Sequence, residues 1–373
     1  MINRTLQIEQ NLEKNKVVII YGPRQVGKTT LVKDFLSKTK LKYKYFLGDQ
    51  IKFANDFSKC DLKLIKEIIS DTELLVIDEA QKIENIGRAL KLVVDNIDNI
   101  FVIVTGSSSF DLANATTEPL TGRKNVINLY PISMEELSKI NSPYDLNNNL
   151  EDYLIYGLYP NIVTYDNPEQ KIGRLVDIKD AYLIRDILEF QKIRNSKMII
   201  NLLKLLAFQI GKEVSTTELG NSLEIDHKTI LNYLDLLEKS FVLYRLDGFS
   251  RNLRKEVSKM SKYYFYDLGI RNALINNFNK IDTRDDIGQL WENFIIMERV
   301  KRNAYQKVYT NYYFWRTYEK KEIDLIEERG GKLYGYEFKW KKKTISPPKD
   351  WLETYDNASY EVISKDNFLD FIT

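Results

Sequence analysis

The alternation of apolar and polar positions predicts several strands and helices in the first third of the chain. Residues 16–36, KVVIIYGPRQVGKTTLVKDFL, contain a short apolar run, a glycine-rich loop and then apolar residues at helical spacing. This order predicts a buried strand, a loop and a helix. ELLVIDEAQ (73–81) and NIFVIVTGSSSF (99–110) have the apolar character of further buried strands. We therefore expect an α/β domain built on a parallel sheet.

The middle of the chain changes to helical spacing. Residues 150 to about 194 have a helical pattern without recognisable chemistry, and we interpret them as packing between domains. Three further helices are predicted at 197–211, 215–223 and 226–239, where Ser215 and Glu218 have capping-box spacing and Asp226 can cap the third helix. On that helix Ile230, Leu234 and their neighbours form one apolar face. Strands at 242–246 and 262–269 follow, and three helices with a β-hairpin predict a winged helix-turn-helix.

The last third combines one long helix with strands. In IGQLWENFIIMERV (287–300), Trp291 and Phe294 share an apolar face, with Glu292 at its edge. NYYFWRTY (311–318) predicts a strand, and EIDLIEERGGKLYGYEFKW (322–340) predicts a hairpin about Gly330 and Gly331. The whole pattern indicates a multidomain α/β protein.

Composition restricts the chemistry that this chain can perform. Its 373 residues exceed the usual size of one hydrophobic core, so two or three domains are expected. One cysteine, Cys60, and one histidine, His227, exclude a disulfide within the chain, a Ser-His-Asp triad and a multi-histidine metal site. The net charge of +2 means that a nucleic-acid surface must be local. No apolar run approaches the roughly 20 residues of a membrane helix, so a cytoplasmic protein with no membrane partner is expected.

Residues 22–29, GPRQVGKT, fit the phosphate-loop pattern G-x-x-x-x-G-K-[ST] between a strand and a helix. In this pattern backbone N–H groups cradle the phosphates of ATP, Lys28 contacts the β- and γ-phosphates, and Thr29 ligates Mg²⁺. The expected ATP contacts are Gly22, Pro23, Arg24, Gln25, Val26, Gly27, Lys28, Thr29 and Thr30.

Two acids follow the second apolar run. Asp78 is predicted to hold the magnesium ion and Glu79 to polarise the attacking water as the catalytic base. The third run delivers Thr105, Ser107 and Ser108 to the same sheet edge, where one hydroxyl could sense the γ-phosphate, although spacing alone does not choose among them.

Arg123 precedes another apolar strand in LTGRKNVIN (120–128). An arginine beside a glycine in this position could contact the nucleotide as an arginine finger or a sensor. It could equally be an ordinary arginine of a surface loop.

A basic segment separates the two strands of the predicted winged helix. It has five cations against the single acid Glu256, which suits contact with DNA phosphates. The alternative is that this wing packs on the ATPase domain or on a partner protein. Its cations are Arg251, Arg254, Lys255, Lys259 and Lys262.

The predicted hairpin carries the second candidate site. With a two-residue turn at Gly330 and Gly331, paired positions sum to 661, so Asp324 lies opposite Glu337 and Glu322 opposite Lys339. Alternation then places all four side chains on one face. Opposed carboxylates repel unless a cation lies between them, which favours a divalent metal with Lys339 orienting a water and Glu292 assisting. The alternative is a solvated face in which Lys339 pairs with Glu322.

The motifs GPRQVGKTT, LLVIDEAQ, VTGSS, LTGR, YFYDLGIRNAL, GQLWENFI, EIDLI and YEFKW extend over nearly the whole chain. On them it resembles the AAA-type ATPases of archaea and bacteria that join a P-loop domain, a winged helix and a C-terminal domain of unknown function with a restriction-endonuclease-like, PD-(D/E)XK core. The resemblance implies the additional-strand class of P-loop proteins, with Glu79 as the catalytic glutamate beside Asp78 and Ser107 near the sensor position. Ile323 stands where the PD-(D/E)XK motif has proline.

These observations predict four regions and a function. The regions are a P-loop ATPase domain at 1–140, a helical connector at 141–195, a winged helix at 196–270 and a restriction-endonuclease-like domain at 271–373. The leading hypothesis is an ATP- and Mg²⁺-dependent ATPase that acts on DNA or is regulated by it, with Asp324, Glu337 and Lys339 as nuclease residues and Glu292 as a further metal ligand. The alternative is an ATP-regulated protein-interaction module that cleaves nothing.

Overall fold

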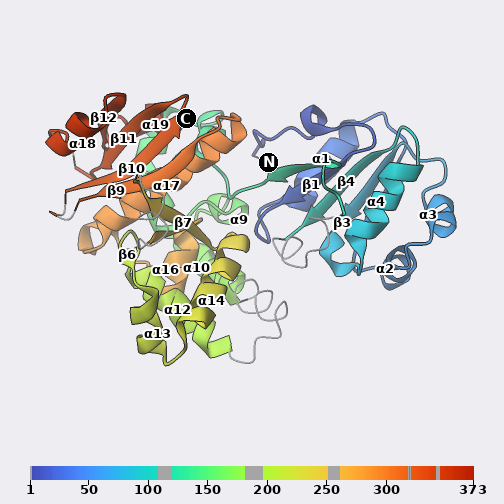
Figure 1. Cartoon of the computed structure of the whole chain (residues 1–373), viewed down its shortest axis with the longest axis horizontal. Coiled ribbons are helices and arrows are strands. Elements are labelled where there is room, and N and C mark those ends of the chain that lie inside the picture. The colour runs from blue at the N-terminus through green and yellow to red at the C-terminus, as the bar shows by residue number, and fades with distance from the viewer. Residues whose placement is uncertain are drawn as a thin grey trace. The chain divides into compact units, whose positions relative to one another are not determined.

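The computed structural model describes residues 2–107, 119–180, 196–250, 261–317, 319, 321–341 and 345–373. The chain forms two compact units (Figure 1). The N-terminal unit contains Arg4–Tyr130 and Lys239–Phe241, and the C-terminal unit contains the rest of the described chain. Within the described ranges, no helix is both long and apolar enough to cross a membrane.

The N-terminal unit is built on a five-stranded parallel sheet in the order β2-β3-β4-β1-β5. Residues of β1, β3 and β4 are almost wholly buried, as their continuous apolar runs predict for a sheet covered on both faces. β4 lies between β1 and β3, which is the additional strand that the family resemblance implies. The elements are η1 (Glu9–Asn11), β1 (Val17–Tyr21), α1 (Lys28–Lys38), β2 (Tyr43–Leu47), α2 (Ile51–Ser58), α3 (Leu62–Ile68), β3 (Leu74–Asp78), η2 (Ala80–Lys82), α4 (Ile86–Asn96), β4 (Phe101–Gly106) and β5 (Lys124–Asn128).

The parallel arrangement gathers the polar strand ends at one edge of this sheet. The phosphate loop follows β1, the predicted acids end β3 and follow it, and Thr105 lies near the end of β4. Because all the strands run in the same direction, these residues meet at the carboxyl edge, where ligands of open α/β sheets bind.

The C-terminal unit contains a second, mixed sheet of seven strands in the order β12-β11-β10-β9-β7-β8-β6. Its elements are α6 (Met134–Ser138), α7 (Pro143–Asn148), α8 (Leu150–Tyr156), α9 (Pro160–Val163), α10 (Pro168–Ile178), α12 (Ser196–Phe208), β6 (Glu213–Val214), α13 (Thr216–Leu223), α14 (His227–Lys239), β7 (Leu243–Gly248), β8 (Ser261–Phe265), α16 (Leu268–Ile275), η4 (Ile281–Thr283), α17 (Ile287–Tyr305), β9 (Asn311–Arg316), β10 (Glu322–Arg329), β11 (Lys332–Phe338), α18 (Lys349–Thr354), β12 (Ala358–Ile363) and α19 (Phe368–Ile372).

The predicted local elements of the middle region are present. Helices α12, α13 and α14 lie where the apolar spacing placed them, and Ser215 and Asp226 each accept a backbone N–H bond at the start of a helix. However, β7 pairs in parallel with β9 through Asp247↔Tyr313 and Gly248↔Phe314. The segments before and after residue 270 therefore share one sheet rather than forming two separate sheets, because this long-range pairing continues the ladder across the predicted boundary.

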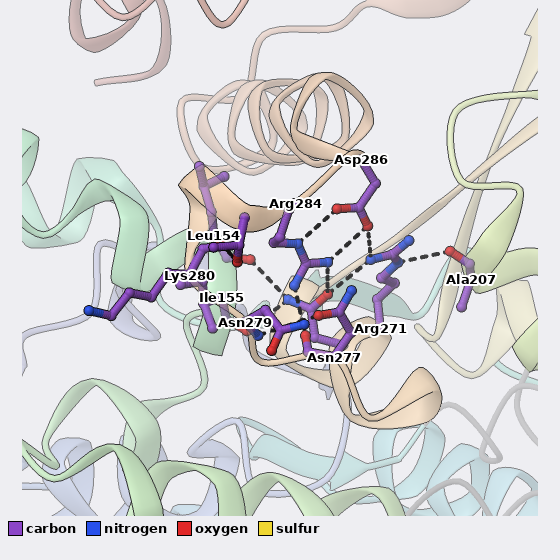
Figure 2. A network of polar contacts seen from close by, with 11 residues as sticks. Leu154, Ile155, Ala207, Arg271, Asn277, Asn279, Lys280, Arg284 and Asp286 are labelled. Carbon is purple, nitrogen blue, oxygen red and sulfur yellow. Dashed lines mark hydrogen bonds and ion pairs between the residues drawn. The ribbon is translucent and has the colours of Figure 1, made fainter.

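A buried polar network holds α16 against its neighbours (Figure 2). Arg271 of α16 donates to the Ala207 carbonyl of α12 at 2.8 Å and to Asp286 before α17 at 2.6 Å. Arg284 binds both oxygens of Asp286, at 2.8 Å each. Asn272 donates to the Leu154 and Ile155 carbonyls of α8. The network therefore ties the helical region that precedes residue 180 to the long helix α17.

Candidate functional site

The phosphate loop has the backbone that its sequence predicts. All nine predicted contact residues, Gly22–Thr30, lie in the loop after β1 or in the first turn of α1. Gly22 has a φ of 155°, and a Cβ atom there would lie 2.1 Å from the Leu129 carbonyl oxygen. Gly27, at the N-cap of α1, has a φ of 98°. These two positions therefore require glycine, and the N-terminus of α1 opens toward the loop as a phosphate site requires.

Lys28 is almost wholly buried beneath this loop. Its ammonium donates hydrogen bonds to the carbonyl oxygens of Gly22 at 2.7 Å and Pro23 at 3.0 Å. The side chain thus curls back under the loop that would hold the phosphates. This position agrees with the predicted role of Lys28 as the cation of the phosphate site.

Three hydroxyl groups hold the carboxylate of Asp78. Thr29 and Tyr45 each donate to Oδ2 at 2.7 Å, and Thr105 donates to Oδ1. Thr29 and Asp78 were predicted as the magnesium ligands, and the structure brings them into contact. Hydroxyl and carboxylate oxygens are the hard ligands that Mg²⁺ prefers, so the residues present fit this ion.

Glu79 follows Asp78 in an unusual backbone conformation. Its φ is 56°, in the left-handed region, and its N–H donates to Thr105 Oγ1 at 3.0 Å. Gln81 donates from its amide to Glu79 Oε2. Left-handed non-glycine residues cost free energy and concentrate at functional sites, so the strain is consistent with a carboxylate placed for chemistry.

One of the candidate sensor hydroxyls contacts the acids of the site. Thr105 contacts both acids of the site, the Asp78 carboxylate and the Glu79 backbone. Ser107 is buried just beyond β4, and Ser108 lies outside the described residues. Thr105 therefore contacts the acids, and a place for Ser107 near the sensor position stays the expectation of the family resemblance.

Arg123 does not lie at the predicted nucleotide site. It precedes β5, and its carbonyl accepts the N–H of Val17 at the start of β1. The phosphate loop is at the other end of β1, one five-residue strand or roughly 16 Å away. The guanidinium instead pairs with Asp95 at 2.5 Å. The predicted contact of Arg123 with the nucleotide of its own chain is wrong, because parallel strands keep their amino ends away from the carboxyl edge.

The C-terminal hairpin has the predicted register. Arg329 pairs with Lys332, and the ladder continues to Leu325↔Tyr336, so every pair sums to 661. Gly330 and Gly331 have φ values of 57° and 72°, as a type I′ turn needs. Asp324 Oδ2 accepts the backbone N–H of Phe338 at 2.8 Å, so this acid lies against the opposite strand as predicted.

The hairpin acids share one partly buried cluster. Lys339 contacts Glu337 Oε1 at 2.5 Å. Burial, followed by the negative charges of Glu292 and Glu337, raises the pKa of Asp324 well above its usual range. Burial also raises the pKa of Glu337, with Glu292 and Glu322 adding to the effect against Lys339. A solvated face is therefore wrong for these acids, and Lys339 pairs with Glu337 rather than with Glu322.

Lys262 occupies a different place from the one predicted. It lies in β8, is 2% exposed, and contacts Glu322 at 2.5 Å and Glu292 at 3.3 Å. Lys262 is therefore not a cation of an exposed wing, because its strand runs inside the seven-stranded sheet. The remaining predicted wing cations, Arg251, Arg254, Lys255 and Lys259, lie outside the described residues.

Glu292 does not join Asp324 and Glu337 in a three-carboxylate metal site within the described ranges. Its Oε1 accepts the hydroxyl of Tyr264 at 2.6 Å as well as the Lys262 ammonium. No group of three or more carboxylate, histidine or cysteine side chains in the described ranges is arranged to hold a metal ion. Glu292 thus acts as the acceptor for Tyr264 and Lys262, while Asp324 and Glu337 remain as a pair.

This pair of acids nevertheless has the chemistry of a small cation site. Glu337 Oε2 is buried and has no hydrogen-bond partner in the described part of the chain. In the part of the chain that the structure describes, the four carboxylates of Glu292, Glu322, Asp324 and Glu337 lie near the two ammonium groups of Lys262 and Lys339. The orphan oxygen and the excess of acids fit a divalent cation held by Asp324 and Glu337.

The site contacts of several residues have no signal in the sequence motifs. Tyr45 lies in a strand without a motif, and Lys262 and Tyr264 come from a strand that precedes the hairpin by about 60 residues. Gln81 follows the acids directly, so proximity in LLVIDEAQ was its only signal. These residues reach their sites through tertiary packing.

Three family models match separate parts of the chain. Residues 14–138 match an AAA domain. Residues 147–281 and 287–365 match two domains of unknown function, DUF8612 and DUF4143. The first match agrees with the phosphate loop and the parallel sheet, and together they support an AAA-type ATPase domain in the N-terminal unit.

Similar whole proteins have no described role. The chain is 26% identical to an uncharacterized protein of Mycobacterium tuberculosis, over 91% of this chain and 73% of that protein. It is 27% and 29% identical to two uncharacterized proteins of Methanocaldococcus jannaschii, covering 86% and 76% of this chain and 74% and 67% of theirs. A solved STAND signal-transduction ATPase with a tetratricopeptide repeat sensor from Pyrococcus horikoshii aligns at 15% identity with a TM-score of 0.25. That alignment covers 81% of this chain and 46% of the solved chain, and so low a score carries no argument about fold.

Proposed function

We propose that the N-terminal unit binds ATP with Mg²⁺ and hydrolyses it. The observation that carries this proposal is the contact between Thr29 and Asp78 at 2.7 Å beside the buried Lys28. These three residues come from the two motifs that ATP hydrolysis needs, and the fold joins them at one sheet edge. Bound Mg²⁺ would supply charge neutralisation at the phosphates.

The roles of the individual residues follow from their chemistry. Backbone N–H groups of the loop and the N-terminus of α1 would bind the phosphate oxygens, and Lys28 would contact the terminal phosphates. Thr29 and Asp78 would hold the magnesium ion. Glu79 would accept a proton from the attacking water, with its carboxylate held by Gln81.

Two substitutions test this function. Lys28→Ala is expected to abolish ATP binding, which can be measured by isothermal titration calorimetry. Glu79→Gln is expected to keep ATP binding and lower turnover by about 10² to 10⁴, because only the base is removed. Glu84→Gln is a matched control, since Glu84 is an exposed carboxylate five residues away. Wild-type turnover by Glu79→Gln would show that another group activates the water.

A second candidate function belongs to the C-terminal unit. We propose a restriction-endonuclease-like site in which Asp324 and Glu337 hold a divalent ion and Lys339 orients water. Three observations support this assignment. The hairpin register brings the two acids opposite each other, the buried Glu337 Oε2 has no hydrogen-bond partner in the described part of the chain, and Lys339 forms an ion pair with Glu337. The alternative remains a protein-interaction module with an inactive site of the same origin.

DNA is the proposed partner of the chain, through the basic segment of the C-terminal unit. Helices α12 to α14 and strands β7 and β8 have the order of a winged helix-turn-helix, whose wing would carry Arg251, Arg254, Lys255 and Lys259. Four cations in one segment suit phosphate contacts that position a duplex without reading its sequence. Under the alternative, the same segment contacts a protein.

A further inference from the structure

We infer that Tyr45 is a positioning residue for the magnesium site, a role that rests on the proposed ATPase function. Its hydroxyl donates to Asp78 Oδ2 at 2.7 Å, the same oxygen that accepts the hydroxyl of Thr29 at 2.7 Å. Thr105 holds the other oxygen. Tyr45 is thus the donor that comes from β2, outside the phosphate loop and the acidic strand.

Three donors fix the orientation of this carboxylate. A carboxylate with one donor can turn about its χ2 torsion, whereas Asp78 has donors on both oxygens from α1, β2 and β4. Hydrogen bonds to charged groups are stronger than those between neutral groups. Removing the Tyr45 hydroxyl would therefore loosen the carboxylate without removing any expected magnesium ligand.

The strand that carries Tyr45 is itself held close to both acids. In the ladder between β2 and β3, Tyr45 pairs with Val76 and Leu47 pairs with Asp78. The N–H of Gly48 donates to the Asp78 carbonyl at 2.7 Å, and a Cβ atom on Gly48 would lie 2.2 Å from the Glu79 carbonyl oxygen. The end of β2 therefore supports the backbone of the two acids as well as the Asp78 side chain.

Aromatic stacking fixes β2 from the other side of the strand. Phe46 stacks on Phe53 of α2 with ring centroids 4.1 Å apart and an angle of 3° between the planes. Side chains of successive strand residues point to opposite faces, so this stacking leaves Tyr45 facing away from α2. A rigid strand places the phenol ring with the precision that a positioning role requires.

The phenol also keeps its proton in this environment. Burial raises the pKa of Tyr45, and the hydrogen bond to Asp78 and the negative charges of Asp78, Glu79 and Asp49 raise it further. At neutral pH Tyr45 is therefore a hydrogen-bond donor, and Asp78 is its acceptor.

The test compares Tyr45→Phe with Tyr43→Phe. Both changes remove one hydroxyl and keep the ring, and the two positions lie on the same face of β2 because they are two residues apart. Tyr43 is 44% exposed and lies two ladder positions further from Asp78 than Tyr45 does. Tyr43→Phe therefore controls for the general effect of a phenol-to-phenyl change on this strand.

ATP affinity is measured by calorimetry with EDTA and with saturating Mg²⁺. For wild type and Tyr43→Phe we expect the same gain in affinity on adding Mg²⁺. For Tyr45→Phe we expect an unchanged dissociation constant in EDTA and a gain that is about tenfold to a hundredfold smaller, as the loss of one hydrogen bond to a charged group implies. The Mg²⁺ concentration for half-maximal turnover should rise by a similar factor.

The outcomes separate this inference from the proposed function. A normal gain in Tyr45→Phe would overturn the inference alone. Equal weakening in EDTA and in Mg²⁺ would also overturn it, because that result indicates a general packing role. Absence of ATP binding by the wild type would overturn the ATPase function, and the inference with it.

Discussion

The buried Lys262 is a counter-ion for the carboxylates of the C-terminal unit. Lys262 approaches Glu322 and Glu292 from β8, and its ammonium also lies 5.2 Å from the ring centroid of Phe314. Burial lowers the pKa of Lys262, but Glu292, Asp324 and Glu322 outweigh this effect and raise the pKa above its usual range. Lys262 is therefore charged at neutral pH and is an internal counter-ion for the acids.

Substituting Lys262 should lower the free energy of unfolding of the C-terminal unit. Lys262→Met keeps the apolar stem and leaves Glu292 and Glu322 without their common cation, so we expect a loss of about 3–5 kcal/mol in the free energy of unfolding at pH 7. All four tryptophans, at positions 291, 315, 340 and 351, belong to this unit, so tryptophan fluorescence during urea denaturation follows it selectively. Lys349→Met, at an exposed lysine, should stay within about 0.5 kcal/mol of wild type. Equal midpoints for the two variants would contradict the role of Lys262 as a buried counter-ion.

At the scale of elements, the carboxylate of Asp286 links the start of α17 to two buried arginines. Asp286 precedes this helix and binds Arg271 and Arg284 (Figure 2). Burial alone would raise the pKa of Asp286, but the hydrogen bonds and charges of Arg284 and Arg271 outweigh it and hold the pKa below its usual value. A carboxyl group with a depressed pKa stabilises the fold above its unfolded pKa of about 3.9, and this contribution is lost as the pH falls toward the folded value.

The variant Asp286→Asn isolates this contribution. It keeps the shape of the side chain and removes the charge, so we expect a loss of about 2 kcal/mol in the free energy of unfolding at neutral pH. The difference between wild type and variant should be constant above about pH 5 and should shrink as the pH falls below about 4. Urea denaturation followed by tryptophan fluorescence at several pH values measures it. A difference that does not change with pH would show that Asp286 acts only through neutral hydrogen bonds.

Elements with local signals were predictable from the sequence, and contacts between distant elements were not. The glycines of the phosphate loop and the Gly330-Gly331 turn dictate local backbone geometry, so the loop and the hairpin register could be derived residue by residue. The pairing of β7 with β9 has no such signal, because strands of this composition can pair with many partners.

The same distinction explains which site residues were found. Lys28, Asp78 and Asp324 belong to patterns in which spacing along the chain fixes spacing in the fold. Tyr45 and Lys262 reach the acids from neighbouring strands, through side chains whose direction depends on the finished sheet. For Arg123, the local pattern suggested a contact with the nucleotide. The residue instead lies beside the amino end of β1, away from the phosphate loop.

At the scale of the whole molecule, each unit has its own set of residues that we propose as metal ligands. The N-terminal unit gathers Thr29 and Asp78 at the carboxyl edge of a parallel sheet. The C-terminal unit places Asp324 and Glu337 on a hairpin of another sheet. Because no residue is shared between the two sets, the proposed ATPase and nuclease chemistries can be removed independently.

Asp324→Ala tests this independence together with the role of DNA. Purified wild type and variant are incubated with single- or double-stranded DNA, Mg²⁺ or Mn²⁺, and ATP, while ATP and DNA breakdown are both followed. We expect Asp324→Ala to abolish any DNA cleavage, since one of two metal-holding carboxylates is lost, and to keep ATP turnover within about twofold of wild type. Glu353→Gln, an exposed acid of the same unit, should change neither rate.

The results of that experiment also separate the two proposed functions of the whole chain. A change in wild-type ATP turnover on adding DNA supports a DNA-dependent ATPase, and cleavage that Asp324→Ala abolishes adds a working nuclease. If DNA leaves ATP turnover unchanged and is not cleaved with either metal, the protein-interaction module becomes the better account. In that case the acids of the hairpin, with Lys262 and Lys339 as their cations, stabilise the seven-stranded sheet, and the substitution Asp324→Ala would alter the unfolding midpoint alone.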